Sequence, residues 1–219
     1  MSEDTQTQTI SEARASILSV IGSRVTLVAA SKRQPDDRIE AALEAGQRVF
    51  GENRVQEAQI RWEPRRAGHS DLQLRLIGPL QTNKAEDAVR LFDVIETLDR
   101  EKLLKALVKA VEKTGAPAPD LLIQVNTGDE PQKGGISVDG LAALLKAARE
   151  TYPGQVSGLM CIPPAEEPAG PHFALLKKLA DQHELSTVSM GMSGDYTLAA
   201  RLGATHVRVG TALFGARDY

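Results

Sequence analysis

The sequence has almost none of the features that identify disulfide-bonded, metal-binding, secreted or membrane proteins. A single cysteine, Cys161, occurs in 219 residues, which excludes an intrachain disulfide, and no CxxC or Cys/His spacing suits a metal site. The first ten residues, MSEDTQTQTI, are polar and acidic, unlike a signal or transit peptide. No apolar run approaches the length needed to cross a bilayer. We therefore expect a cytoplasmic protein with no metal ion and no membrane partner.

The charge balance is close to neutral. The chain carries 26 Lys and Arg against 29 Asp and Glu, a formal net charge of −3. Binding to a nucleic-acid backbone needs clustered excess positive charge, so we expect no nucleic-acid partner. Hydrophobic residues make up 42% of the chain and charged residues 25%, as in a globular domain. A chain of 219 residues is long enough for one domain with a sizeable core.

Short apolar segments alternate with segments of helical periodicity along the chain. We predict strands over residues 25–30, 48–51, 72–78, 93–97, 120–126, 155–162, 186–193 and 205–210. Each is followed by a predicted helix, over residues 35–45, 53–67 (ending near Pro64), 83–92, 100–115, 138–152, 171–184, 195–203 and 211–219. One further helix is predicted before the first strand, over residues 11–22.

Eight strand–helix pairs favour a closed (β/α)8 TIM barrel of parallel strands. We predict a flexible tail over residues 1–9 and a single barrel domain over residues 10–219, with the extra helix at its N-terminal end. An open, doubly wound sheet is the structural alternative. No GxGxxG motif follows the first predicted strand, however, so a dinucleotide-binding crevice is not expected.

Polar residues and glycines collect where the predicted strands end, which is the face on which such barrels carry their chemistry. Lys32 follows the first strand and Asn53 the second. Taken alone, Lys32 also fits a solvated strand end, and FGEN fits a plain turn. Arg208 lies inside the apolar segment HVRVG, where a charged side chain needs a partner. We assign no role to the four histidines: residues 69, 172 and 183 fit loops or helix surfaces, and His206 lies at the opposite end of the barrel.

The ends of the last two strands form the most specific local signal. SMGMSGD contains Ser189, Gly191 and Ser193, and RVGTALFG contains Gly210 and Thr211. Barrels of this kind commonly bind phosphate in the loops after strands seven and eight, where glycines allow close approach and hydroxyl groups donate hydrogen bonds. Because the last strand pairs with the first in a closed barrel, a phosphate-bearing aldehyde bound there could condense with Lys32.

Several segments together resemble one known family. ASK, AGQRVFGENRVQE, LIGPLQTNK, LIQVNTGDEPQKGGI, GLMCIPP, SMGMSGD and VRVGTALFGARDY are similar to blocks of the YggS/PROSC family of pyridoxal phosphate homeostasis proteins, relatives of the N-terminal barrel of alanine racemase. The resemblance implies that Lys32 forms the internal aldimine with pyridoxal 5'-phosphate and that Asn53 and Arg208 face the ring. It also implies a set of further cofactor contacts, at Ser189, Gly191, Gly210 and Thr211 in the phosphate cup, with Met160 and Ser193 beside them.

The resemblance also favours a carrier over an enzyme. An arginine facing the ring nitrogen would leave that nitrogen unprotonated and make carbanion formation less favourable. Racemisation needs a second acid or base, which alanine racemase takes from an additional β domain. We expect this chain, which ends at Tyr219, to lack that domain, and packing explains Tyr196 better than an acid role does. We predict a monomer that buffers the cofactor and delivers it to apo-enzymes, with weak racemase-type activity left open.

Two lysines in predicted loops, Lys84 and Lys133, could assist release of the cofactor by transimination, or could simply be solvated. Two other functions are kept as alternatives. One is a small pyridoxal-phosphate-dependent racemase or decarboxylase that uses Lys32 as its base. The other is an aldolase that forms a Schiff base on Lys32 without a cofactor.

Overall fold

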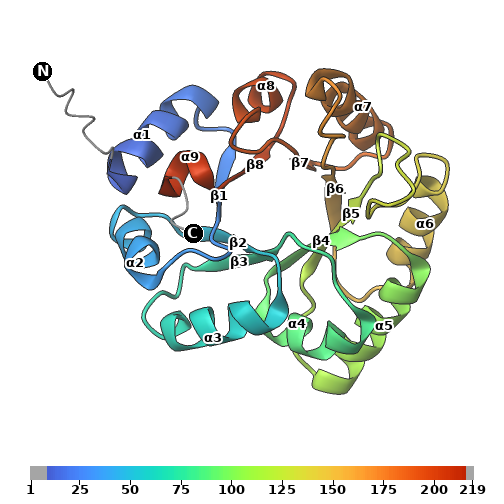
Figure 1. The fold of residues 1–219 in the computed structure, drawn as a ribbon. Coiled ribbons are helices and arrows are strands. Elements are labelled where there is room, and N and C mark those ends of the chain that lie inside the picture. The colour runs from blue at the N-terminus through green and yellow to red at the C-terminus, as the bar shows by residue number, and fades with distance from the viewer. Residues whose placement is uncertain (1–8, 216–219) are drawn as a thin grey trace, which may run out of the picture.

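The structure, a computed structural model, describes residues 9–215. The predicted flexible tail, apart from Thr9, and the last four residues of the predicted final helix lie outside this range. Within it, eight parallel strands close into a barrel in sequence order, and β8 pairs with β1 (Figure 1). Helices surround the strands, so the predicted (β/α)8 barrel is confirmed.

The strands are short, as expected for segments buried on both faces. Their bounds are β1 Thr26–Ala30, β2 Val49–Glu52, β3 Gln73–Leu76, β4 Val94–Leu98, β5 Asp120–Gln124, β6 Val156–Met160, β7 Thr187–Ser189 and β8 His206–Val209. All eight lie within or overlap the predicted strands. The difference is largest at β7, which ends at Ser189 because Gly191 adopts a left-handed turn with φ +92°.

The helices lie close to their predicted positions. Their bounds are α1 Ile10–Ile21, α2 Asp36–Glu44, α3 Val55–Arg66, α4 Ala85–Leu91 after the short 3-10 helix η1 Thr82–Lys84, α5 Glu101–Thr114, α6 Leu141–Thr151, α7 Ala169–Gln182, α8 Tyr196–Arg201 and α9 Thr211–Phe214. The additional N-terminal helix, α1, begins at a capping box between Thr9 and Glu12. It lies beside α9 on the outside of the barrel (Figure 1).

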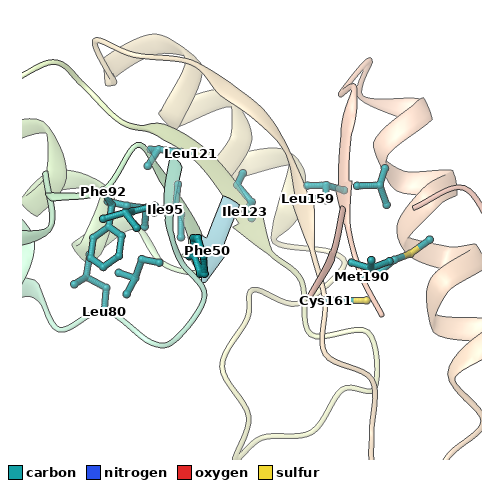
Figure 2. Packing of buried hydrophobic residues seen from close by; sticks show 14 of the residues in the cluster. Phe50, Leu80, Phe92, Ile95, Leu121, Ile123, Leu159, Cys161 and Met190 are labelled. Carbon is teal, nitrogen blue, oxygen red and sulfur yellow. The ribbon is translucent and has the colours of Figure 1, made fainter. Parts of the chain in front are cut away.

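Side chains of each strand alternate between the helix-facing core and the barrel interior. In β6, Leu159 joins the large cluster under the helices, whereas Met160 packs with Val94 and Leu122 in a separate cluster. Figure 2 shows part of the large cluster, with Leu159 and Ile123 on neighbouring strands. The second cluster therefore belongs to the barrel interior.

The interior also holds polar side chains. Glu96, on β4, accepts a hydrogen bond from the Ser189 hydroxyl, on β7, at 2.6 Å. These two strands are not neighbours in the barrel, so this bond crosses its interior. Such a buried polar network lies directly beneath the mouth where the predicted site residues collect.

The second barrel helix, α3, ends at Arg66, two residues past Pro64 and within the predicted segment. One expectation from the sequence is wrong. His172 is not on a loop or a helix surface: it is 7% exposed, with Nδ1 3.1 Å from the Thr127 carbonyl and Nε2 3.1 Å from Glu167.

Candidate functional site

A cavity of about 280 Å³ opens at the carboxyl ends of β1, β2 and β8. It brings together six of the nine residues that the sequence proposes as cofactor contacts. Its lining comprises Ala30, Lys32, Asn53, Ile77, Ile162, Met192, Ser193, Gly194, Arg208, Gly210 and Thr211. The predicted juxtaposition of the first and last strands, with Lys32 beside the last two loops, is therefore what the fold produces.

Lys32 lies two residues beyond β1, in a loop that turns into α2. Its side chain is half-buried and lines this cavity as well as a neighbouring one of about 250 Å³. Ala30, which ends β1, is the small residue beside it, and Asn53 lines both cavities. The amine is thus placed at the mouth of the barrel with an open volume in front of it.

Arg208 enters the cavity from β8 and is 4% exposed. Its Nη1 donates to the Ser189 hydroxyl at 2.7 Å, and its Nη2 donates to the Cys161 carbonyl at 2.7 Å. Glu96 lies behind it, with Oε2 3.9 Å from Nη1. The buried charge that the sequence singled out therefore has its partner, and these contacts fix the guanidinium group in the floor of the cavity.

Burial acts to raise the pKa of Glu96, but Arg75 and Arg208 outweigh it and hold this pKa below its ordinary value. Arg75 Nε donates to Glu96 Oε1 at 2.5 Å. Glu96 is therefore an ionised carboxylate between two buried guanidinium groups. It does not line the cavity, so its charge orients Arg208 instead of facing a ligand.

Three of the nine proposed contacts do not line the cavity. Ser189 is fully buried, and its hydroxyl is hydrogen-bonded to Glu96 and Arg208. Met160 is fully buried in the interior cluster. Gly191 lies in the turn beneath the mouth, where a Cβ would come within 2.5 Å of the Ala199 Cβ. These three support the site from below.

Ser193, in the loop after β7, lines the cavity. Its Oγ accepts hydrogen bonds from the amides of Gly210 and Ala212, both at 3.2 Å. Because the oxygen acts as the acceptor in both, the hydroxyl hydrogen can be donated to a ligand in the cavity. Thr211 lies next to it and is exposed.

The sequence reasoning missed a buried carboxylate on the other side of the mouth. Glu52 is fully buried at the end of β2, and its Oε1 accepts hydrogen bonds from Ser31, Arg61 and Trp62. The segment FGEN was interpreted as a possible turn. The sequence does contain a signal for this carboxylate. A glutamate close after the apolar pair Val49–Phe50 is expected to be buried and to need a partner of opposite charge, by the same argument as for Arg208.

The two loop lysines lie outside the Lys32 cavity. Lys84 lines a separate cavity of about 680 Å³, which also touches Asn53, and its Nζ is 3.8 Å from Asp87. Lys133 Nζ is 2.7 Å from Glu130 Oε2 and donates to the Pro163 carbonyl at 3.3 Å. Tyr196 begins α8 and is absent from the cavity lining.

Over residues 9–215, no group of three or more His, Cys, Asp or Glu side chains is arranged to hold a metal ion. None of the helices in the described part of the chain is long and apolar enough to cross a membrane.

A family model described as alanine racemase, N-terminal domain, matches residues 24–218. The chain belongs to this family. Relatives in the same family include the pyridoxal phosphate homeostasis protein of Vibrio cholerae, which is 41% identical over an alignment of 207 positions that covers 90% of this chain and 87% of that protein. The protein of the same name from Escherichia coli K12 is 39% identical and covers 89% of this chain and 87% of its own length. The family resemblance inferred from the sequence blocks is confirmed.

Solved structures agree with the family assignment. PipY of Synechococcus elongatus PCC7942, with PLP bound, superposes with a TM-score of 0.83 at 38% identity and covers 94% of this chain and 100% of that chain. Alanine racemase from Acinetobacter baumannii superposes with a TM-score of 0.76 at 15% identity, covering 96% of this chain and 62% of that chain. The latter similarity shows the shared barrel fold alone.

Proposed function

We propose that this protein binds pyridoxal 5'-phosphate covalently at Lys32, and that it holds and supplies the cofactor with little or no turnover of its own. Relatives at 39–41% identity are named pyridoxal phosphate homeostasis proteins, and the similar PipY has been solved with PLP bound. The cavity at the mouth of the barrel supports the same proposal through its residues.

The lining suits an aldehyde that carries a phosphate group. When bound, pyridoxal phosphate supplies an aldehyde that condenses with a primary amine, with loss of one water, and an electron-withdrawing ring. Lys32 supplies the amine, and Ser193 and Thr211 supply hydroxyl donors that line the same cavity. A Cβ on Gly210 would meet only atoms of Ala30, at 3.5 and 3.6 Å. Packing within the protein therefore does not require a glycine at position 210. Because Gly210 has no side chain, this part of the cavity has room for a ligand.

One observation carries the carrier role. Among the described residues that line the 280 Å³ cavity, the ionisable side chains are those of Lys32 and Arg208. The carboxylate in the neighbouring 250 Å³ cavity, Glu57, is paired with Arg54 at 3.1 Å. Racemisation needs a second acid or base on the opposite face of the substrate, and an arginine, which stays protonated in proteins, is poorly suited to that step. A ring facing Arg208 meets a fixed cation rather than a carboxylate, which disfavours carbanion chemistry.

The first test is the visible absorption spectrum of the purified protein, before and after borohydride reduction, with peptide mapping by mass spectrometry. We expect a visible band that reduction fixes as a mass increment on Lys32, and loss of the band in Lys32→Ala but not in Lys84→Ala. If the protein shows no visible absorption band even with added pyridoxal phosphate, the proposal is wrong. Loaded protein should not convert L-alanine to D-alanine or release carbon dioxide from amino acids, and turnover would favour a racemase or decarboxylase instead.

We further propose that the protein acts as a cytoplasmic monomer and delivers its cofactor to apo-enzymes. The open position of Lys32 at the mouth of the barrel supports access by an acceptor. Transfer can be followed as recovery of activity by an apo-enzyme mixed with loaded protein. The variants Lys84→Ala and Lys133→Ala test whether either loop amine takes part, and unchanged transfer rates would remove both from the process.

A further inference from the structure

The loop that carries Lys32 is held in a strained conformation. Arg33, the next residue, has φ +57°, in the left-handed region that non-glycine residues seldom adopt. The loop closes on itself through a hydrogen bond from the Gln34 amide to the Ser31 carbonyl, at 3.1 Å. Strain of this kind costs free energy and persists only where surrounding contacts impose it. The contacts that impose it here come from α3.

Arg61, on α3, bridges both ends of this loop. Its Nη1 donates to the Ser31 carbonyl at 2.9 Å, and its Nη2 donates to the Gln34 carbonyl at 2.8 Å. The guanidinium group is 14% exposed. A planar group with several donors in a fixed geometry can hold two carbonyl oxygens at a set separation, which a lysine ammonium does less well.

Glu52 holds Arg61 in place. Its Oε1 accepts from Arg61 Nη1 and from the Ser31 hydroxyl, both at 2.7 Å, and from Trp62 Nε1 at 2.9 Å. Its side chain is 0% exposed, so these three donors to Oε1 offset part of the cost of its burial, while Oε2 is buried without a hydrogen-bond partner. Ser31 directly precedes Lys32, and Glu52 directly precedes Asn53. The carboxylate of Glu52 is therefore hydrogen-bonded to the residue before Lys32 and directly precedes Asn53 in the chain, and both Lys32 and Asn53 line the cavity.

We propose that Glu52 and Arg61 are positioning residues that hold the Lys32 loop, and with it the reactive amine, in the conformation that binds the cofactor. The effect on cofactor binding rests on the proposed function, whereas the restraint of the loop is a property of the ligand-free protein. It predicts that loosening the loop will slow covalent loading and speed release without removing Lys32. Neither residue lines the 280 Å³ cavity, so both act through the backbone of the loop and through Asn53.

The experiment compares Arg61→Met, Arg61→Lys and the matched control Arg66→Met. Arg66 is on the same helix, but it donates to the Leu91 carbonyl and Asp93, away from the loop. Two measurements are made on each variant. The first is amide hydrogen exchange of residues 31–34 in the ligand-free protein. The second is the rate at which the visible band of the loaded protein is lost when hydroxylamine traps the released cofactor.

Arg61→Met loses three charge-assisted hydrogen bonds, two to the loop carbonyls and one to Glu52. Loss of the two bonds to the loop predicts at least a roughly tenfold rise in both the exchange rate and the release rate. Arg61→Lys keeps the charge beside Glu52 but not both carbonyl bonds, so intermediate rates are expected. It also serves as the test if Arg61→Met does not fold. Arg66→Met should match the wild type in both measurements.

The two proposals fail in different ways. If the wild-type protein never acquires the visible band, the proposed function fails, and the exchange measurement still tests the restraint on the loop. If the wild type loads but both Arg61 variants exchange and release at wild-type rates, the positioning role is wrong. Equal acceleration in Arg66→Met would also overturn it, because general loss of stability would then explain the change.

Discussion

Replacing Glu96 with glutamine removes one negative charge from the barrel interior and keeps the size of the side chain. In the wild type, Glu96 is 0% exposed, and its two partners, Arg75 and Arg208, are 4% and 3% exposed. The carboxylate accepts from Arg75 at 2.5 Å and from Ser189 at 2.6 Å. The variant leaves two buried guanidinium groups with no carboxylate between them.

These exposures decide which magnitude applies. Exposed ion pairs contribute about 0–1 kcal/mol, because water screens them. Removing one partner of a buried pair costs about 3–5 kcal/mol, because the remaining charge has already lost its hydration. We expect Glu96→Gln to lower the free energy of unfolding by about that amount, out of a total of about 5–15 kcal/mol. For a chain of this size the midpoint of thermal unfolding should fall by roughly 6–20 °C.

The assay is urea unfolding at pH 7, followed by circular dichroism. The control is Glu101→Gln on the surface of α5, where Glu101 pairs with Lys105 and both side chains are well exposed. We expect this control to unfold at the wild-type urea concentration. If Glu96→Gln also does so, the interior charge is not needed for stability, and the account of Arg208 as held by Glu96 is wrong.

The same network makes a prediction about pH. The pKa of Glu96 lies below its ordinary value of 4.5 in the folded protein. A carboxyl group with a lowered folded pKa contributes stability that is present above its unfolded pKa and is lost as the pH falls through its folded pKa. The stability difference between wild type and Glu96→Gln should therefore be constant from neutral pH down to about 4.5 and shrink below it.

Two further predictions concern stability. Gly191→Ala should lower the free energy of unfolding by about 1–3 kcal/mol in a urea titration. A Cβ at this position, where φ is +92°, would lie 2.5 Å from the Ala199 Cβ. The control is Gly170→Ala, whose Cβ would meet nothing closer than 3.8 Å and which should leave the stability unchanged. Burial, aided by Arg75, lowers the pKa of His206 to about 4. Because the unfolded chain binds that proton near pH 6.5, stability should fall by roughly 3 kcal/mol between pH 6.5 and 4. Urea titrations at stepped pH should show this slope in the wild type and not in His206→Gln.

The sequence was sufficient for the fold because every strand and helix had its own local signal. Alternating apolar and helical segments predicted eight pairs, and closure of the barrel then placed Lys32 beside the loops after β7 and β8. The resemblance to a family added which chemistry such a cavity performs. None of this required knowledge of side-chain direction.

The depth at which each proposed contact lies depends on side-chain direction, which the sequence does not give. Strands of a parallel barrel are apolar on both faces, so periodicity does not tell which residues point inward or how deep they lie. Met160 and Ser189 were therefore expected at the mouth, although both lie in the interior below it. Glu52 and Arg61 were missed because their bonds join β2, α3 and the loop after β1, which only the folded chain brings together.

The two buried carboxylates have the same role on two sides of this cavity. Glu52 lies behind the Lys32 loop and Glu96 lies behind Arg208, and neither lines the cavity. Each accepts a hydrogen bond from an arginine within the protein, so its negative charge orients that arginine. The groups left to line the cavity are an amine, a guanidinium group and hydroxyl donors. Such a set suits an anionic ligand with a group that an amine can attack, which is the chemistry of the cofactor that we propose.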